Sequence, residues 1–111
     1  MQLNIVEQGD IVKIEIQEER MDAHNSGDLK EQMLQLFDEG KCNLIIDLSG
    51  VRFVDSSGLG ALVSGFKNAS AREGSLKLCS LQPQVRSMFE LTRLHRVFEI
   101  FSSVEEALES Y

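Results

Sequence analysis

Two adjacent hydroxyl side chains, Ser56 and Ser57, lie between an acid and two glycines in the stretch VDSSGLG, residues 54–60. An aliphatic run, residues 43–49, comes before them, and apolar residues at helical spacing follow from Leu59. The stretch is therefore a junction between a buried strand and a helix. A serine there can accept a bond from an unpaired backbone N–H as a helix cap, or it can act as a nucleophile if a base activates it.

Two glycines, Gly58 and Gly60, follow the serines in what we expect to be the first helical turn. Each glycine in a helix costs up to about 1 kcal/mol relative to alanine. A cap formed by Ser56 or Ser57, which we expect, accounts for one serine but not for the glycines. Glycines leave the backbone bare so that another surface can approach it, and close packing against the sheet also demands small residues.

Three enzymatic motifs fail at this stretch. A dinucleotide fingerprint starting at the glycines of residues 58–60 needs a third glycine where Val63 stands. A phosphate-binding loop needs a lysine where Phe66 stands. A nucleophile elbow around Ser56 needs a glycine where Val54 stands. The sequence therefore disfavours nucleotide binding and an esterase-type site.

The remaining chemistry-bearing residues are few. His24 and His95 are the two histidines, and nothing in the sequence indicates that either reaches Ser56, so a small serine hydrolase or phosphotransferase lacks an identifiable base. No cluster has the spacing of metal ligands, and we expect no metal and no cofactor. Cys42 and Cys79 lie in or beside apolar runs without CxxC spacing, and we expect reduced thiols.

The hydrophobic pattern predicts a small α/β fold. Gly9-Asp10 separates two alternating runs and predicts a hairpin. The later parallel strands need right-handed helical crossovers, so we expect a mixed sheet of about four or five strands with about four helices mainly on one face. The expected strands are at 3–8, 11–16, 43–49, 75–81 and 97–101. The expected helices run from Asn25 or Ser26 to Gly40, from Leu59 to near Glu73, from Pro83 onward, and from the residue after Ser103. Ser103 is expected to form a capping box with Glu106.

Composition and charge limit the partners. The 111 residues, 42% of them hydrophobic, fit one compact domain, and no apolar run approaches the roughly 18 residues that span a bilayer. We expect a soluble, cytoplasmic protein without membrane insertion.

The net charge is −7, with 11 acids and 4 bases in residues 1–50 and seven of each in residues 51–111. This charge disfavours nucleic acids and anionic membranes, and the acidic half serves either solubility or a basic partner.

The stretch IIDLSGVRFVDSSGLGALVSGFKNA, residues 45–69, resembles the signature of STAS domains, in particular the free-standing anti-sigma factor antagonists of bacteria. GDIVKIEIQEERMDAHN resembles their first hairpin and the following loop, and VFEIFSSVEEAL resembles their closing strand and helix. The resemblance covers nearly the whole chain and implies a single STAS domain over residues 1–111.

The resemblance implies a phosphorylation switch. A partner that inhibits a sigma factor is itself a serine kinase and phosphorylates the first serine of DSSG, here Ser56. The unphosphorylated antagonist binds this anti-sigma factor, and the sigma factor is released. A serine phosphatase of the metal-dependent type resets the switch. The partner-binding residues carried over by the resemblance are Asp22, Asp55, Ser57, Gly58, Leu59 and Gly60.

The sequence departs from the family pattern at Glu19, where many members have glycine, and this departure bears on the conformation of the loop before Asp22 and on its contact with a partner. An alternative within the same family is a STAS subunit of a phospholipid-transport or stress-signalling complex. In that role the domain docks a protein, and Ser56 need not be phosphorylated.

Overall fold

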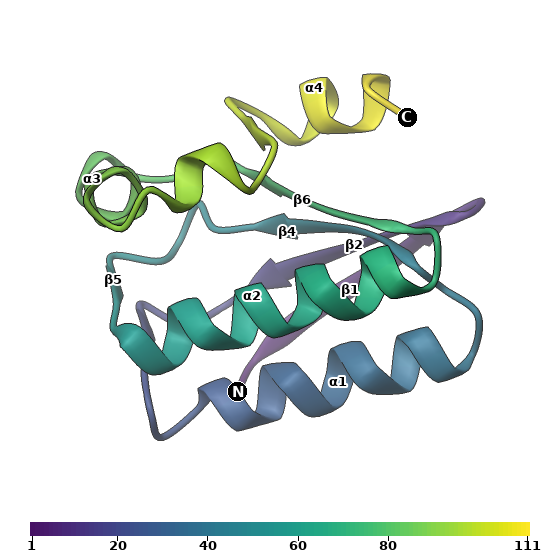
Figure 1. Ribbon diagram of the computed structural model, residues 1–111, viewed down its shortest axis with the longest axis horizontal. Helices are drawn as coiled ribbons and strands as arrows, with labels where there is room; N and C mark the ends of the chain where they lie inside the picture. Colours follow the sequence, from purple (N-terminus) through teal and green to yellow (C-terminus); the bar gives the residue numbers. More distant parts are fainter.

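The computed structural model describes residues 1–111 as a mixed five-stranded sheet with strand order β1-β2-β4-β6-β7, flanked by four helices (Figure 1). The strands are β1 (Leu3–Gln8), β2 (Ile11–Ile16), β3 (Arg20–Met21), β4 (Asn43–Asp47), β5 (Phe53–Val54), β6 (Ser75–Cys79) and β7 (Ile100–Phe101). The helices are α1 (Ser26–Asp38), α2 (Ser56–Ala71), α3 (Pro83–Leu91) and α4 (Val104–Glu109), with one 3-10 turn, η1 (Leu94–Arg96). The predicted α/β class and mixed sheet are confirmed.

The hairpin and the parallel strands form as the sequence predicts. β1 pairs antiparallel with β2, with Leu3 opposite Ile16, and Gly9 in the turn adopts a φ of +62°. This left-handed conformation strains other residues but not glycine. β2, β4, β6 and β7 then pair in parallel, which places β4 in the middle of the sheet.

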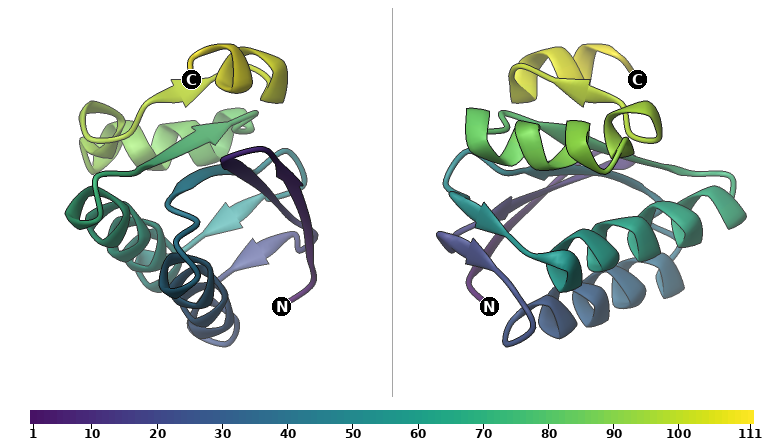
Figure 2. Two further views of the ribbon diagram at one scale, coloured as in Figure 1. Left: turned by 90° about the vertical axis from the view of Figure 1, so that its right-hand side faces the viewer. Right: turned by 60° about the vertical axis from the view of Figure 1, so that its left-hand side comes forward.

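The central strand is covered on both faces. Leu44 and Ile46 of β4 belong to the main core beneath α1 and α2, whereas Ile45 lies in a smaller cluster with Cys79 and Ala107 of α4. Both views in Figure 2 show α1 and α2 side by side, with α4 apart from them. Burial, followed by the carboxylate of Asp47, raises the pKa of the Cys79 thiol to about 11. This thiol therefore stays protonated at neutral pH.

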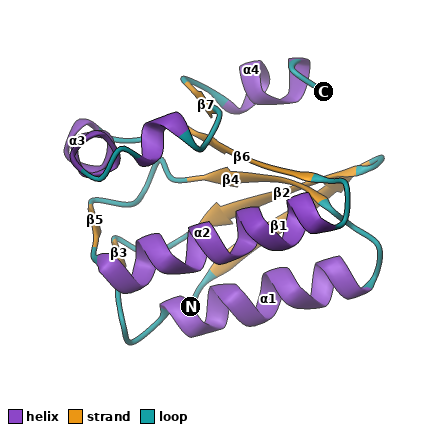
Figure 3. Cartoon of the chain, viewed as in Figure 1, coloured by secondary structure: helices purple, strands orange, loops and turns teal.

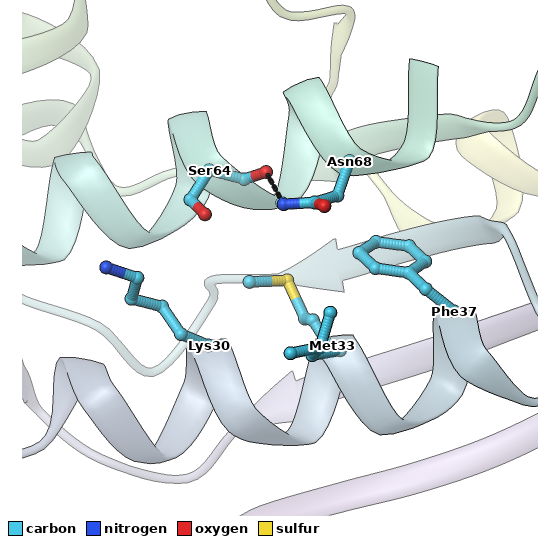
Figure 4. Close-up of a pocket in the computed structure, with 7 residues that line it drawn as sticks. Lys30, Met33, Phe37, Ser64 and Asn68 are labelled. Carbon is cyan, nitrogen blue, oxygen red and sulfur yellow. Dashed lines mark hydrogen bonds between the residues drawn. The ribbon is translucent and has the colours of Figure 1, made fainter. Parts of the chain in front are cut away.

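Helices α1 and α2 pack against each other, and Met33 and Phe37 of α1 point toward α2 (Figure 4). A Cβ added to Gly65 of α2 would lie 2.7 Å from Sδ of Met33 on α1 and 2.8 Å from Cδ1 of Leu76 on β6, so these two side chains occupy the space that the glycine leaves. The hollow beside this contact is lined mainly by Lys30, Phe37, Ser64 and Asn68, and Asn68 Nδ2 donates to the Ser64 carbonyl at 2.9 Å. The hollow is a by-product of helix packing.

Some local predictions are confirmed and others are wrong. Pro83 opens α3, and Ser103 Oγ accepts from the Glu106 N–H at 3.2 Å, as predicted. Asn25 precedes α1 but does not cap it, because its side chain bonds backward to the Arg20 carbonyl and the Asp22 N–H. The predicted last strand is reduced to two residues, and β3 and β5 are additional. None of the helices is long and apolar enough to cross a bilayer.

Candidate functional site

A two-stranded parallel ribbon positions the serines (Figure 3). β3 pairs with β5, with Arg20 opposite Phe53 and Met21 opposite Val54. The Asp55 N–H continues this ladder by donating to the Met21 carbonyl at 3.1 Å. The ribbon lies where the chain leaves β4 and enters α2, as expected for a site at the carboxyl end of a parallel strand.

Asp55, not a serine, caps α2. Its backbone is extended (φ −95°, ψ −174°), and its Oδ1 accepts from the Gly58 N–H at 3.0 Å. Our prediction that Ser56 or Ser57 forms the cap is therefore wrong. A carboxylate accepts the same bond as a hydroxyl, and its charge also suits the positive end of the helix dipole. Ser56 is the first helical residue, exposed, and its hydroxyl makes no hydrogen bond within the protein.

The cap assignment yields a stability prediction. Asp55→Ala is expected to lower the free energy of unfolding by about 1 kcal/mol, because the Gly58 N–H loses its acceptor. Ser56→Ala is expected to change it by only a few tenths of a kcal/mol, since the hydroxyl bonds to nothing in the fold. Asp55→Asn, which keeps an oxygen acceptor, is the matched control. Urea unfolding measures all three, and an equal loss in Ser56→Ala and Asp55→Ala would contradict the assignment.

The two glycines of DSSGLG have different roles. A Cβ on Gly58 would lie 2.6 Å from the Met21 carbonyl oxygen and 2.8 Å from Cγ1 of Val54. Gly58 is therefore required for close packing of α2 against the ribbon. Gly60 is exposed, and a Cβ there would meet nothing within 4 Å. Only Gly60 leaves bare backbone facing outward.

The ribbon brings the Asp22 loop to the start of α2. Met21 accepts the bond from Asp55, and Asp22 follows it directly. Asp22 Oδ1 accepts from the His24 N–H at 3.0 Å, and Asp22 Oδ2 lies 3.6 Å from Nε of Arg20. These contacts hold the carboxylate in a tight turn. Asp22 and Asp55 therefore lie on loops joined by β3 and β5.

Glu19 fits the loop without strain. The left-handed non-glycine residues of the chain are Glu73, Ser80 and Arg93, so Glu19 is not among them. Its carbonyl accepts from the N–H groups of Arg52 and Phe53, at 2.8 and 3.1 Å. Its side chain is 76% exposed, with its carboxylate 3.8 Å from the Arg52 guanidinium. The departure from glycine thus adds surface charge rather than a new backbone conformation.

An exposed aromatic side chain next to the serines was not among the predicted site residues. Phe53 is 41% exposed, and the Arg20 guanidinium carbon lies 4.3 Å from its ring centroid. Successive side chains of a β-strand point to opposite faces, so in β5 the Val54 side chain is buried in the core and the Phe53 side chain is exposed. Leu59, which was carried over as partner-binding, is only 6% exposed and packs in the main core.

Neither histidine is hydrogen-bonded to the serines. His95 belongs to η1, and its Nδ1 is 3.3 Å from the Phe89 carbonyl oxygen. His24 is exposed in the Asp22 loop, and no hydrogen bond links either ring to Ser56. No group of three or more histidine, cysteine or acidic side chains is placed to hold a metal ion.

Comparisons with known proteins agree with this architecture. The STAS domain family model matches residues 2–107. The anti-sigma-B factor antagonist of Bacillus subtilis strain 168 is 32% identical over 89 residues, covering 80% of this chain and 81% of that protein. A solved anti-sigma factor antagonist from Mycobacterium paratuberculosis superposes with a TM-score of 0.87 at 20% identity, covering 98% of this chain and 92% of that one. The Bacillus cell fate determinant SpoIIAA in its phosphorylated form gives a TM-score of 0.77 at 20% identity, covering 98% of both chains. With a family match over nearly its whole length, the protein belongs to the STAS domain family.

Proposed function

We propose that this protein is an anti-sigma factor antagonist whose binding is switched by phosphorylation of Ser56. The unphosphorylated form binds an anti-sigma factor that is also a serine kinase, and the sigma factor is released. The observation that carries the proposal is the free hydroxyl of Ser56: it is exposed at the first position of α2, and the fold does not need it because Asp55 is the cap.

The surroundings of Ser56 suit a partner interface. Gly60 and Ser57 present little side chain beside it, and Phe53 with Arg20 gives an aromatic and a cationic contact on the adjoining ribbon. Aromatic and arginine side chains are enriched among residues that dominate interface energies. Asp22 and Asp55 already place negative charge at this surface, so a further negative charge there becomes unfavourable once a partner excludes water.

A phosphate would act locally. It adds about −1.5 to −2 charges next to the Asp55 carboxylate, without replacing any hydrogen bond that the fold uses. The fold therefore has no need to rearrange, and the change falls on the surface that meets the partner. A serine phosphatase of the metal-dependent type would restore the binding form.

This role is binding rather than catalysis. A serine nucleophile is activated by a base to which it is hydrogen-bonded, and the Ser56 hydroxyl is hydrogen-bonded to neither a histidine nor a carboxylate: Asp22, Asp55 and His95 bond elsewhere. The relatives that match the chain carry names of regulators: the Bacillus subtilis protein is an anti-sigma-B factor antagonist. These names support the same role here.

Affinity capture from the native cell tests the proposal. The wild-type protein and Ser56→Ala are expected to retain a kinase-like anti-sigma factor, identified by mass spectrometry, and Ser56→Asp is expected to retain much less. Phosphate incorporation by that kinase should map to Ser56 and vanish in Ser56→Ala. Capture of a transport or stress-signalling assembly by all three baits alike would instead indicate a docking module of another complex.

A further inference from the structure

α3 and η1 form a basic surface on an otherwise acidic protein. Residues 86–97 hold three arginines and one glutamate, whereas the whole chain has a net charge of −7. Arg86, Arg93 and Arg96 are exposed, and none of them is in an ion pair. Unpaired guanidinium groups are available to carboxylates of another molecule.

Apolar side chains accompany these arginines. Leu91 is 81% exposed and Val97 is 44% exposed. They lie on a rigid support, because Phe89 is fully buried and its ring centroid is 5.8 Å from that of Phe98 in an edge-to-face contact. Single exposed leucines are common on protein surfaces, but a leucine close to arginines in the chain offers both apolar and charged contacts.

This surface lies at the same end of the molecule as Ser56. α3 follows β6 and packs against β5, and Gln82 Nε2 before α3 donates to the Ser49 carbonyl at 2.7 Å. The right-hand view of Figure 2 shows β3, β5 and α3 stacked at the end where α2 begins. β5, which leads into Ser56, thus lies between the acidic loop that follows β2 and the basic α3.

The size of the molecule decides what a partner must touch. The chain measures 32 × 28 × 24 Å and exposes 5887 Å² in total. A stable interface covers about 800 Å² on each partner, a patch close to 30 Å across. A partner centred on Ser56 therefore reaches about 15 Å in each direction, over β5 and toward the elements beside it.

We propose that the α3–η1 surface, made of Arg86, Leu91, Arg93, Arg96 and Val97, is the second half of the partner-binding face and takes an acidic segment of the partner that carries an apolar side chain. This inference rests on the proposed function. The partner's surface opposite α3 and η1 is then acidic. Charge complementarity of this kind fixes the orientation of the partner. Phosphorylation leaves the arginines unchanged, so this half persists in both states of the switch.

The test uses the purified anti-sigma factor found by affinity capture, titrated by calorimetry at low salt. Arg93→Glu combined with Arg96→Glu is expected to weaken binding at least tenfold, and Arg96→Glu alone about threefold. The matched control is Lys67→Glu, which makes the same single charge reversal on the exposed side of α2, about 16 Å along the helix from Ser56. It is expected to leave affinity within about 1.5-fold. Thermal melts check that each variant is folded.

The outcomes are distinguishable. In one outcome the double variant binds the partner as tightly as wild type does while phosphorylation of Ser56 still weakens binding. In that case the α3–η1 surface is not part of the interface, and the proposed function stands. If wild type binds no anti-sigma kinase, the proposed function fails and this inference fails with it. If the arginine changes abolish binding to phosphatidylserine vesicles or duplex DNA but leave partner affinity unchanged, the surface serves another ligand and the inference is overturned.

Discussion

Phosphorylation of Ser56 is expected to weaken binding to the anti-sigma partner by about a hundredfold. Two like charges about 6 Å apart repel by roughly 3 kcal/mol at an effective dielectric of about 20, before salt screening. A hundredfold loss of affinity needs only about 2.7 kcal/mol. Ser56 is exposed beside Asp55 at the proposed interface. Water screens the repulsion between the phosphate and Asp55 in the free protein, and the repulsion grows when a bound partner excludes that water, so one phosphate weakens binding without unfolding the helix.

Two substitutions separate charge from capping. Ser56→Ala is expected to bind like wild type, since the hydroxyl makes no bond in the fold. Ser56→Asp is expected to lose only part of the affinity, because it adds one charge and lacks the third oxygen of phosphate. Raising the salt concentration should narrow the difference between these two variants, since screening acts on exposed charges. Calorimetry at low and high salt measures both effects, and equal affinities at low salt with intact folding would leave Ser56 without a role in binding.

Gly58 and Gly60 are expected to respond in opposite directions to the same substitution. Gly58→Ala should lower the free energy of unfolding by about 1–3 kcal/mol, because its methyl group would lie 2.6 Å from the Met21 carbonyl and force α2 away from the ribbon. Gly60→Ala should raise it by up to about 1 kcal/mol, because alanine favours the helix and its methyl group meets nothing.

The affinity for the partner is expected to distinguish Gly60 from Gly58 as well. Gly60→Ala places a methyl group on the bare backbone beside Ser57 and should weaken partner binding while the protein becomes more stable. Urea unfolding and calorimetry on the two variants measure this pattern. A Gly58→Ala protein as stable as wild type would mean that α2 does not pack on the ribbon as closely as the structure describes.

Long, regular elements could be predicted from the sequence because their patterns repeat. β4 reads as a continuous aliphatic run because both of its faces are covered, and α1 buries Leu29, Met33 and Leu36 at helical spacing. β3 and β5 could not be predicted, because two-residue strands have no period to detect. They exist only through their pairing with each other, which joins segments more than thirty residues apart in the chain.

Finer details of the site depend on three-dimensional contacts. Aspartate and serine are almost equally good caps, so the sequence of DSSG could not decide between Asp55 and Ser56. Nor could it show that Gly58 faces the Met21 carbonyl while Gly60 faces outward. The arginines of residues 86–97 read as scattered bases, and only the fold places them beside the strand that leads to Ser56.

The central claim is that the unphosphorylated protein displaces a sigma factor and the phosphorylated protein does not. The most direct measurement is the release of fluorescently labelled sigma factor from its complex with the anti-sigma factor, followed by anisotropy as this protein is added. One preparation, divided into a portion phosphorylated at Ser56 and a portion treated with phosphatase, keeps every other variable equal. We predict release by the dephosphorylated portion at concentrations about a hundredfold below those needed by the phosphorylated portion. Equal release by the two portions, or release by neither, would contradict the account.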